Sequence, residues 1–380
     1  MKNIVILGSG SVGLVAAKLL LDTKNYCIRV VDRKFDGSVF VEMGKYKNFY
    51  TNEADISNVQ ILEKLLTESS ADAVISCLPY FLNPLVAIVA KKLSVHYFDT
   101  TEDIAVTQKI REISLESSKA FAPQCGLAPG LVNIVANSMA SNFDDLDSIK
   151  IRVGALPIAP SNMLKYGLTW STDGLINEYG NSCQSILGGK IVEVQPLEGL
   201  EFLSIDGANY ECFNTSGGLG TLAETYDGKV RNMVYKTMRY PGHCQMMRFL
   251  MNDLKLNENR ELLKKIIEYA IPKIFQDIVV MFVTVTGKKG ADFVEENYIE
   301  KIYGQRIDNK NYTALQLTTA GSLCAVVEKV LSNHGRYCGF IKQESFSLED
   351  IKNSSFGHCF TNSTKYPIIG NGIVEFSMKK

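Results

Sequence analysis

The residues with the clearest chemical purpose form the segment Gly8-Ser9-Gly10-Ser11-Val12-Gly13. Three glycines at this spacing, after the apolar run Ile4–Leu7 and before a helical pattern, are typical of a dinucleotide-binding turn. Gly8 permits the tight turn, Gly10 lets a pyrophosphate approach the backbone, and Gly13 lets helix and strand pack closely. N–H groups at the start of the helix attract the phosphates. The segment predicts a nicotinamide dinucleotide site; the alternative is a turn that binds another anion or nothing.

Acidic and basic residues near the second expected strand bear on which dinucleotide binds. Asp32 stands where a carboxylate accepts hydrogen bonds from the adenosine ribose and repels a 2′-phosphate, so it favours NAD. Arg33 and Lys34 follow directly and suit such a phosphate, so NADP stays open. Asp55, after the third expected strand, is either an adenine contact or a surface helix cap.

Polar residues also follow the fourth and fifth expected strands, at the edge where parallel sheets bind ligands. The segment Ser76-Cys77-Leu78-Pro79-Tyr80 is expected near the diphosphate and the nicotinamide ribose, with the Tyr80 hydroxyl offered to substrate or simply packed. The segment Asp99-Thr100-Thr101-Glu102-Asp103 is expected to bind a substrate ammonium through Asp99 and to supply Glu102 as general base. The same run equally suits a helix cap.

A single thiol is expected where the chain passes between domains, in Cys125-Gly126-Leu127-Ala128-Pro129-Gly130. As a hypothesis, Cys125 touches substrate or nicotinamide without acting as a covalent nucleophile. The alternative is a small buried apolar side chain, which is how most lone cysteines behave.

Alternating short apolar runs and amphipathic stretches predict the elements that position these residues. Strands are expected at 4–7, 28–31, 49–51, 73–76, 97–99 and 120–122, with helices at 12–21, 59–67, 84–92 and 104–117. Right-handed crossovers then give an α/β domain with a Rossmann-type, doubly wound parallel sheet over residues 1–126. Later strands (149–153, 190–194, 202–205, 277–286) and helices (261–269, 314–331) predict a second, mixed α/β substrate and dimerisation domain over 127–338. Residues 339–380 are expected to pack back onto the first domain.

Composition narrows the classes of partner. The 380 residues carry 40 Lys plus Arg against 41 Asp plus Glu, so a broad basic face for nucleic acid is not expected. No uninterrupted tract of 18 apolar residues occurs, which argues against a membrane span. Nine cysteines without a C-x-x-C pair fit reduced thiols and a cytoplasmic location, and the four histidines lack metal-ligand spacing.

Several segments resemble the saccharopine dehydrogenase family. They are Val74–Tyr80, Tyr97–Asp103 and Gln124–Gly130, together with Trp170-Ser171-Thr172-Asp173-Gly174 and Tyr235–His243. The resemblance implies an N-terminal nicotinamide-binding domain followed by a substrate domain. It implies oxidation, or formation, of a carbon–nitrogen bond in an amino acid, with an imine that water hydrolyses. Lysine 6-dehydrogenases, which are relatives, do the same to the side-chain amine of lysine.

The resemblance also supplies candidates in the second domain. Arg239 is expected to clamp a substrate carboxylate, since the family's matching arginine lies on the substrate side and a fork of donors suits that group. Lys236 and Tyr240 accompany it, and His243 is either an acid or base near neutral pH or a structural residue.

One difference between this chain and the glutamate-forming family members bears on which reaction it catalyses. Glutamate-forming members carry a Tyr-Pro-Asn-Arg-Asp-Ser segment whose arginine helps to bind substrate carboxylate, whereas this chain has Phe213-Asn214-Thr215-Ser216-Gly217-Gly218. The loss suggests a substrate with fewer carboxylates, or another way of holding one. The expectations are therefore a saccharopine dehydrogenase-type enzyme, a lysine 6-dehydrogenase, or a catalytically silent cofactor-binding regulatory protein. A homodimer is expected by analogy.

Overall fold

The computed structural model describes residues 1–35, 37, 43–308, 310–333, 335–361, 368–369 and 372–373. The chain divides into two compact units: Met1–Leu131 with Thr318–Cys359, and Val132–Leu317 with Phe360–Lys380. The expected second domain extended to residue 338, but residues 318–338 cluster with the first unit. The reason is that the long helix α11 (Ala314–Ser332) contacts helix α1 (Ser11–Asp22), where the Cys324 thiol lies 3.6 Å from the Ala16 carbonyl oxygen.

A seven-stranded parallel sheet forms the centre of the first unit. Its order is β17-β6-β5-β4-β1-β2-β3, which confirms the doubly wound topology, since strand order reverses between β1 and β4. The strands are β1 (Lys2–Leu7), β2 (Tyr26–Asp32), β3 (Phe49–Glu53), β4 (Ala73–Ser76), β5 (His96–Asp99), β6 (Ala120–Ala122) and β17 (Gly339–Phe340). Strand β17 brings the start of the C-terminal segment onto this sheet, and residues up to Cys359 cluster with the first unit as expected, whereas Phe360 and the described residues after it cluster with the second.

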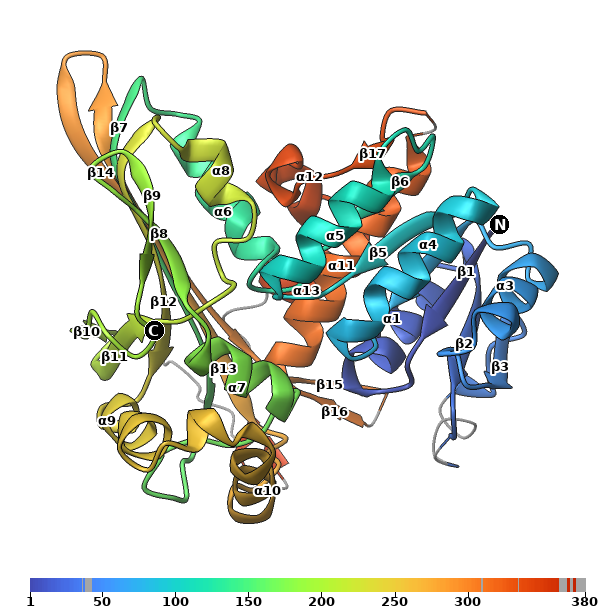
Figure 1. Cartoon of the computed structure of the whole chain (residues 1–380), viewed down its shortest axis with the longest axis horizontal. Coiled ribbons are helices and arrows are strands. Elements are labelled where there is room, and N and C mark those ends of the chain that lie inside the picture. The colour runs from blue at the N-terminus through green and yellow to red at the C-terminus, as the bar shows by residue number, and fades with distance from the viewer. Residues whose placement is uncertain are drawn as a thin grey trace. The chain divides into compact units, whose positions relative to one another are not determined.

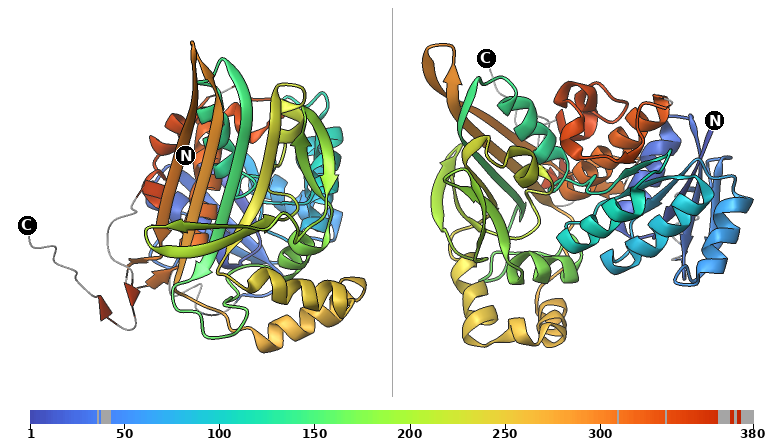
Figure 2. Two further views of the ribbon diagram at one scale, coloured as in Figure 1. Left: turned by 90° about the vertical axis from the view of Figure 1, so that its left-hand side faces the viewer. Right: turned by 45° about the horizontal axis from the view of Figure 1, so that its top comes forward.

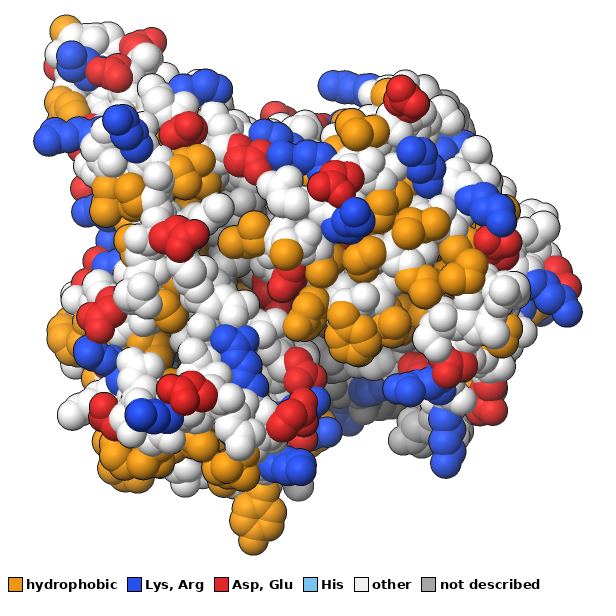
Figure 3. Space-filling view, in the orientation of Figure 1, with side chains coloured by type: hydrophobic (Ala, Val, Ile, Leu, Met, Phe, Trp, Pro, Cys, Tyr) orange, Lys and Arg blue, Asp and Glu red, His pale blue; other side chains and the backbone are white. Residues whose placement is uncertain are grey.

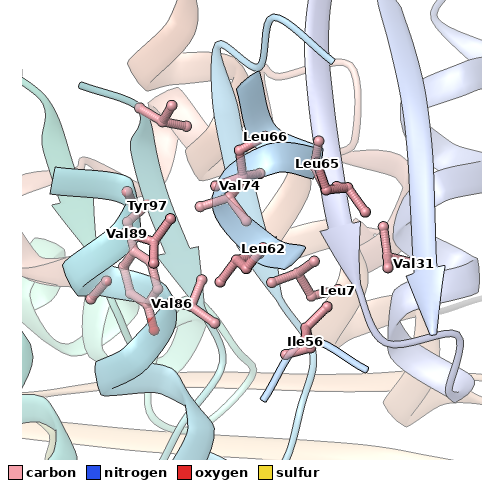
Figure 4. Packing of buried hydrophobic residues seen from close by; sticks show 14 of the residues in the cluster. Leu7, Val31, Ile56, Leu62, Leu65, Leu66, Val74, Val86, Val89 and Tyr97 are labelled. Carbon is pink, nitrogen blue, oxygen red and sulfur yellow. The ribbon is translucent and has the colours of Figure 1, made fainter. Parts of the chain in front are cut away.

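Helices α3 (Val59–Glu68), α4 (Asn83–Leu93) and α5 (Ile104–Ser114) lie side by side along one face of this sheet (Figure 1). Leu7, Val31 and Val74 from the sheet pack there against Leu62 and Val86 from the helices (Figure 4). Right-handed crossovers place α1 on the opposite face. The alternation of apolar and polar residues therefore predicted these helices and strands.

Helix α11 is long and apolar enough to cross a membrane by composition, with a mean hydropathy of 1.2. However, 72% of that window is buried inside the structure, which is the burial of a core helix.

The second unit is built on a mixed, eight-stranded sheet with the main order β10-β11-β12-β7-β13-β14 (Figure 2). Strand β12 pairs in parallel with β7, and the other neighbours along this path are antiparallel. Its strands are β7 (Asp145–Pro157), β8 (Cys183–Leu187), β9 (Lys190–Val194), β10 (Glu201–Ile205), β11 (Ala208–Asn214), β12 (Val230–Arg239), β13 (Asp277–Lys289) and β14 (Asp292–Tyr303). The mixed α/β expectation for this part of the chain is confirmed.

Helices of the second unit cover part of this sheet. They are α6 (Leu131–Ala140), α7 (Thr172–Gly180), α8 (Leu222–Tyr226), α9 (His243–Arg248) and α10 (Arg260–Ala270). Tyr179 of α7, Met247 of α9 and Leu263 of α10 share one buried cluster with Phe213 of β11. This cluster lies beside the buried charges of Arg239 and Glu178, which are described below.

On the surface displayed in Figure 3, basic and acidic side chains are interspersed and gather into no broad basic patch. Apolar side chains gather over the region of α4 and α5 in that view. The most exposed large apolar residues in these helices and next to their ends are Phe81, Leu115 and Ile88, at 65%, 64% and 54%.

Candidate functional site

The glycine-rich turn between β1 and α1 has the backbone that its sequence predicts. Gly8 has a φ of 102°, a left-handed conformation that favours glycine, and an added Cβ would lie 2.6 Å from the carbonyl oxygen of Cys77. A Cβ on Gly13 would lie 2.1 Å from the carbonyl oxygen of Gly8. Both positions therefore admit only glycine, because the turn, the helix and strand β4 meet there.

Gly10 differs from these two glycines in having open space in front of it. An added Cβ would meet nothing within 4 Å, and its φ of −69° is accessible to any residue. Gly10 occupies the N-cap of α1, so no side chain caps the N–H groups of the first turn, and that turn carries no acidic residue. Open backbone beside uncapped donors is what a dinucleotide diphosphate requires, so the residues present fit this cofactor.

Asp32, at the end of β2, holds the turn in place. Its Oδ2 accepts hydrogen bonds from the Ser9 N–H at 2.6 Å and the Ser9 hydroxyl at 2.8 Å, and its Oδ1 accepts from the Arg33 N–H at 2.7 Å. Burial acts to raise the pKa of Asp32, but these hydrogen bonds outweigh it and lower the pKa below the ordinary value. The Asp32 carboxylate, which was expected to favour NAD, therefore already accepts hydrogen bonds from Ser9 and Arg33 of the protein itself.

The other residues expected to contact the adenosine half of the cofactor, Arg33, Lys34 and Asp55, lie on the surface. Arg33 and Lys34 are exposed, as binding of a phosphate would require. Asp55 accepts hydrogen bonds from the Ser57 N–H and hydroxyl, which lower its pKa, and the cap of α3 is Asn58 instead. The helix-cap alternative for Asp55 is therefore wrong, and its contact with adenine stays a prediction.

The segment after β4 leaves the sheet beside the glycine turn. The Ser76 hydroxyl donates to Asn83 Oδ1 at 2.7 Å, and the Cys77 N–H donates to the Leu7 carbonyl oxygen at 2.8 Å. Leu78 packs against the apolar core, Pro79 is exposed, and the half-buried Tyr80 begins a short 3-10 turn. The position of Cys77 against Gly8 places this segment next to the expected diphosphate.

The end of β5 differs from its expected role. Asp99 is 0% exposed and accepts hydrogen bonds from the Tyr97 hydroxyl at 2.5 Å and from the N–H groups of Thr101 and Gln124. Burial raises its pKa, and these hydrogen bonds oppose the rise. A fully enclosed carboxylate does not reach a substrate ammonium, so the expectation that Asp99 binds substrate is wrong.

The two carboxylates that follow, Glu102 and Asp103, differ in their surroundings. Asp103 caps α5 by accepting from the Val106 N–H at 2.8 Å, which confirms the capping alternative for this residue. Glu102 is half-buried, and its role as general base stays a prediction.

Cys125 is also enclosed in the first unit. Its side chain is 0% exposed, its thiol lies 3.0 Å from the Ala122 carbonyl oxygen, and Gln343 Nε2 donates to its sulfur at 3.3 Å. Burial raises the pKa of the Cys125 thiol well above its usual value. The structure therefore favours the alternative of a buried, unreactive cysteine over direct contact with substrate.

Arg239, at the end of β12, lies in a buried network in the second unit. Its side chain is 5% exposed, Nε donates to the Tyr179 hydroxyl at 2.9 Å, and a second nitrogen lies 3.7 Å from Glu178 Oε2. Its guanidinium also faces the ring of Tyr166 at 5.2 Å. Burial acts to lower the pKa of Arg239, but Tyr179, Tyr166 and Glu178 raise it, so the group stays charged. The carboxylate clamp stays a prediction, and these partners favour a structural role.

Two companions expected beside Arg239 point elsewhere. Successive side chains alternate across a strand, so Lys236 and Arg239 lie on opposite faces of β12. Lys236 Nζ donates to the Gly199 carbonyl oxygen at 2.6 Å and to Glu201 at 3.1 Å. The Tyr240 hydroxyl donates to the Pro157 carbonyl oxygen at 2.9 Å. The expected grouping of these residues with Arg239 is wrong, because Lys236 lies on the opposite face of β12 and Tyr240, just beyond the end of that strand, bonds to Pro157.

His243 is buried with both ring nitrogens engaged. Nδ1 lies 2.7 Å from the Leu164 carbonyl oxygen, so it carries the proton, and Nε2 lies 3.0 Å from the Tyr179 hydroxyl. Burial and then the Arg239 charge lower the pKa of His243 to about 3. His243 is therefore held neutral and enclosed, with both ring nitrogens bonded to protein, which favours the structural alternative over an acid or base role.

The burial of a neutral His243 predicts that the folded protein loses stability in acid. Below pH 6.5 the unfolded chain protonates His243 while the folded chain does not until about pH 3. The free energy of unfolding should then fall with decreasing pH through this window, by up to roughly 1.4 kcal/mol per pH unit. Urea denaturation across the window should show a flatter dependence for His243→Gln, whereas exposed His358→Gln should keep the wild-type slope. Equal slopes for all three proteins would contradict the assignment.

Several residues that organise these regions were not identified from the sequence, namely Glu178, Tyr179, Tyr166 and Gln343. Only their packing in three dimensions identifies them. Among the residues that the structure describes, no three His, Cys, Asp or Glu side chains gather as a metal site.

A parallel sheet with an open glycine turn at its first crossover, in a chain with a second unit on a mixed sheet, is the organisation of a two-domain α/β protein that binds a dinucleotide. A family model described as the saccharopine dehydrogenase NADP binding domain matches residues 4–123. A model described as the saccharopine dehydrogenase C-terminal domain matches residues 126–354. The chain belongs to the saccharopine dehydrogenase family. NAD as the main cofactor is not supported, since the matching domain is named for NADP.

Similar proteins share this organisation. The chain is 21% identical over 379 residues to "Saccharopine dehydrogenase [NADP(+), L-glutamate-forming]" of Schizosaccharomyces pombe, covering 92% of this chain and 82% of that protein. It is 26% identical to the bovine mitochondrial alpha-aminoadipic semialdehyde synthase, covering 80% of this chain but only 33% of that protein, so it spans about a third of that relative's length. The structure of apo saccharopine dehydrogenase (L-Glu forming) from Saccharomyces cerevisiae superimposes with a TM-score of 0.72 at 18% identity, covering 93% and 96% of the two chains. This similarity shows the fold.

Proposed function

We propose that the chain is an NADP-dependent, saccharopine dehydrogenase-type enzyme that oxidises or forms a carbon–nitrogen bond of an amino acid. The observation that carries the proposal is the open backbone at Gly10 within a domain that matches the family's NADP-binding model. The match to a glutamate-forming relative over 82% of its length supports saccharopine as the substrate to test first.

When bound, the cofactor supplies hydride transfer. The backbone from Gly8 to Gly13 holds its diphosphate, and Asp32 fixes that turn through Ser9. The loops after β4, β5 and β6 line the ligand edge of the sheet toward the nicotinamide. Glu102 is the candidate for taking the substrate's proton, since Asp99 and His243 are enclosed.

The proposal is tested by mixing the protein with NADP⁺ or NAD⁺ and with saccharopine or lysine, and following the absorbance of the reduced cofactor. We expect reduction with saccharopine and NADP⁺. Reduction with lysine alone would instead establish a lysine 6-dehydrogenase, which the missing arginine of the Phe213–Gly218 segment favours. NADP⁺ binding without turnover of either amine would establish the silent, regulatory alternative.

The exposed position of Arg33 predicts a preference for NADP⁺ over NAD⁺. Since Asp32 is engaged with Ser9 and Arg33 is exposed beside it, we expect Arg33 to bind the 2′-phosphate of NADP⁺. Arg33→Ala should weaken NADP⁺ binding roughly tenfold or more and leave NAD⁺ binding unchanged, because a charged hydrogen bond contributes about 1.5–3 kcal/mol. Calorimetric titration of both cofactors measures this, with exposed Lys91→Ala as the control. Equal losses for the two cofactors would refute the role.

A further inference from the structure

The loop that follows β6 has a conformation that ordinary residues avoid. Gln124 has a φ of 64°, in the left-handed region, although it is not a glycine. Such a conformation costs about 1–2 kcal/mol and persists only where the surroundings impose it. Its side chain is 3% exposed, so the loop is packed as well as strained.

One buried carboxylate holds this loop from the side of β5. Asp99 Oδ1 accepts the N–H of Gln124 at 3.1 Å and that of Thr101 at 2.9 Å, so it joins the loops after β6 and β5. The Asp99 carbonyl oxygen accepts the Cys125 N–H at 2.8 Å. The Tyr97 hydroxyl fixes the other carboxylate oxygen at 2.5 Å. Asp99 therefore ties both loops to the sheet.

One buried amide holds the same loop from the side of β17. Gln343 is 1% exposed, and its Nε2 donates to the Pro123 carbonyl oxygen at 2.7 Å and to the Cys125 sulfur at 3.3 Å. Its Oε1 is buried and has no hydrogen-bond partner in the described structure, so the amide is oriented by these two donated bonds. The Ile341 N–H donates to the Phe121 carbonyl oxygen, which sets Gln343 beside the end of β6.

The tethered loop lies at the ligand edge, on the nicotinamide side. In a doubly wound sheet the cofactor crosses the carboxyl ends of the strands at the switch point, and its two halves lie on opposite sides. Here β2 and β3 lie on the adenosine side of β1, whereas β4, β5 and β6 lie on the other. The loop after β6 therefore belongs to the half that orients the reacting ring.

We propose that Asp99 and Gln343 are positioning residues that together hold the Pro123–Gly126 loop as a rigid wall for the nicotinamide half of the cofactor. Neither residue touches substrate or cofactor; both act through the loop. The inference rests on the proposed function for its effect on turnover, but the tether itself is a property of the protein alone. It also gives the C-terminal segment that carries Gln343 a part in the site.

The tether is tested first without turnover, in the full chain. Gln343→Met keeps the length of the side chain and removes the donor, so Cys125 should become accessible. We expect alkylation of Cys125 by iodoacetamide, mapped by peptide mass spectrometry, to accelerate at least roughly tenfold. Cys324, also 0% exposed, serves as an internal control, and buried Ile351→Val as the matched variant in the same segment. Unchanged labelling of Cys125, or equal acceleration of Cys324, would overturn the tether.

The effect on the reaction is tested with saccharopine and NADP⁺. Gln343→Met and Asp99→Asn should each lower kcat by ~10–100-fold, while NADP⁺ affinity changes by less than about threefold, because the ring is misplaced and the diphosphate is not. Ile351→Val should leave kcat unchanged. A parallel loss of kcat and cofactor affinity, or no loss, would overturn the positioning role. A wild-type protein without turnover would contradict the proposed function, while the labelling result would still decide the tether.

Discussion

Replacing Arg239 with alanine should lower the free energy of unfolding by about 3–5 kcal/mol, because it leaves the buried Glu178 carboxylate without its cation. The Tyr179 hydroxyl would also lose the donated bond that links it to the guanidinium. Urea denaturation of wild type and variant measures the change. This loss should precede any effect on substrate binding, so the KM of Arg239→Ala is interpretable only at temperatures where the variant stays folded.

The chain offers a matched control for this prediction. Arg248 pairs with Glu198 at 3.0 Å, but both side chains are about half exposed, so Arg248→Ala should change stability by roughly 0–1 kcal/mol. The double replacement Arg239→Met with Glu178→Leu should recover most of the lost stability, since it removes both buried charges. If Arg239→Ala unfolds like wild type and only raises KM, the guanidinium serves substrate, and the structural assignment fails.

The second large effect concerns the glycine turn. Gly10→Ala should fold with a stability within about 1 kcal/mol of wild type, since its Cβ meets nothing within 4 Å. The same methyl group would occupy the space where the diphosphate approaches, so NADP⁺ affinity should fall by roughly 100-fold or more. Thermal denaturation and fluorescence titration with NADPH measure the two quantities separately.

Gly13→Ala distinguishes this effect from general damage to the turn. Its Cβ would lie 2.1 Å from the Gly8 carbonyl oxygen, so the variant should lose about 1–3 kcal/mol of stability together with cofactor binding. Retention of NADP⁺ affinity in Gly10→Ala would show that the diphosphate does not rest at this turn, and a loss of stability in the same variant would contradict the open space in front of Gly10.

The first unit was largely predictable from the sequence because its signals are local. Parallel strands buried on both faces appear as short apolar runs, such as 4–7 and 120–122, and the helices between them have clear periodicity. The glycine turn was predictable for the same reason, since the backbone at Gly8 and Gly13 requires glycine. The domain boundary was not predictable, because α11 is largely apolar and nothing in its sequence indicates which unit it joins.

The site residues were harder to predict because burial is not a local property. Asp99 and His243 have the chemistry of catalytic groups, yet both are enclosed with their polar atoms bonded to protein. Lys236 is close to Arg239 in sequence but points from the other face of β12, a strand that was not among those predicted. Gln343 lies more than 200 residues from its partners, as the separation of 218 from Cys125 shows, so no spacing rule finds it.

The central claim is that a nicotinamide dinucleotide rests its diphosphate on the backbone between Gly8 and Gly13. A crystal structure of the protein grown with NADP⁺ tests it most directly. We predict diphosphate oxygens within hydrogen-bond distance of the N–H groups in the first turn of α1, with the nicotinamide half toward the loops after β4, β5 and β6. A dinucleotide bound elsewhere, or a turn that stays empty at saturating NADP⁺, would contradict the account.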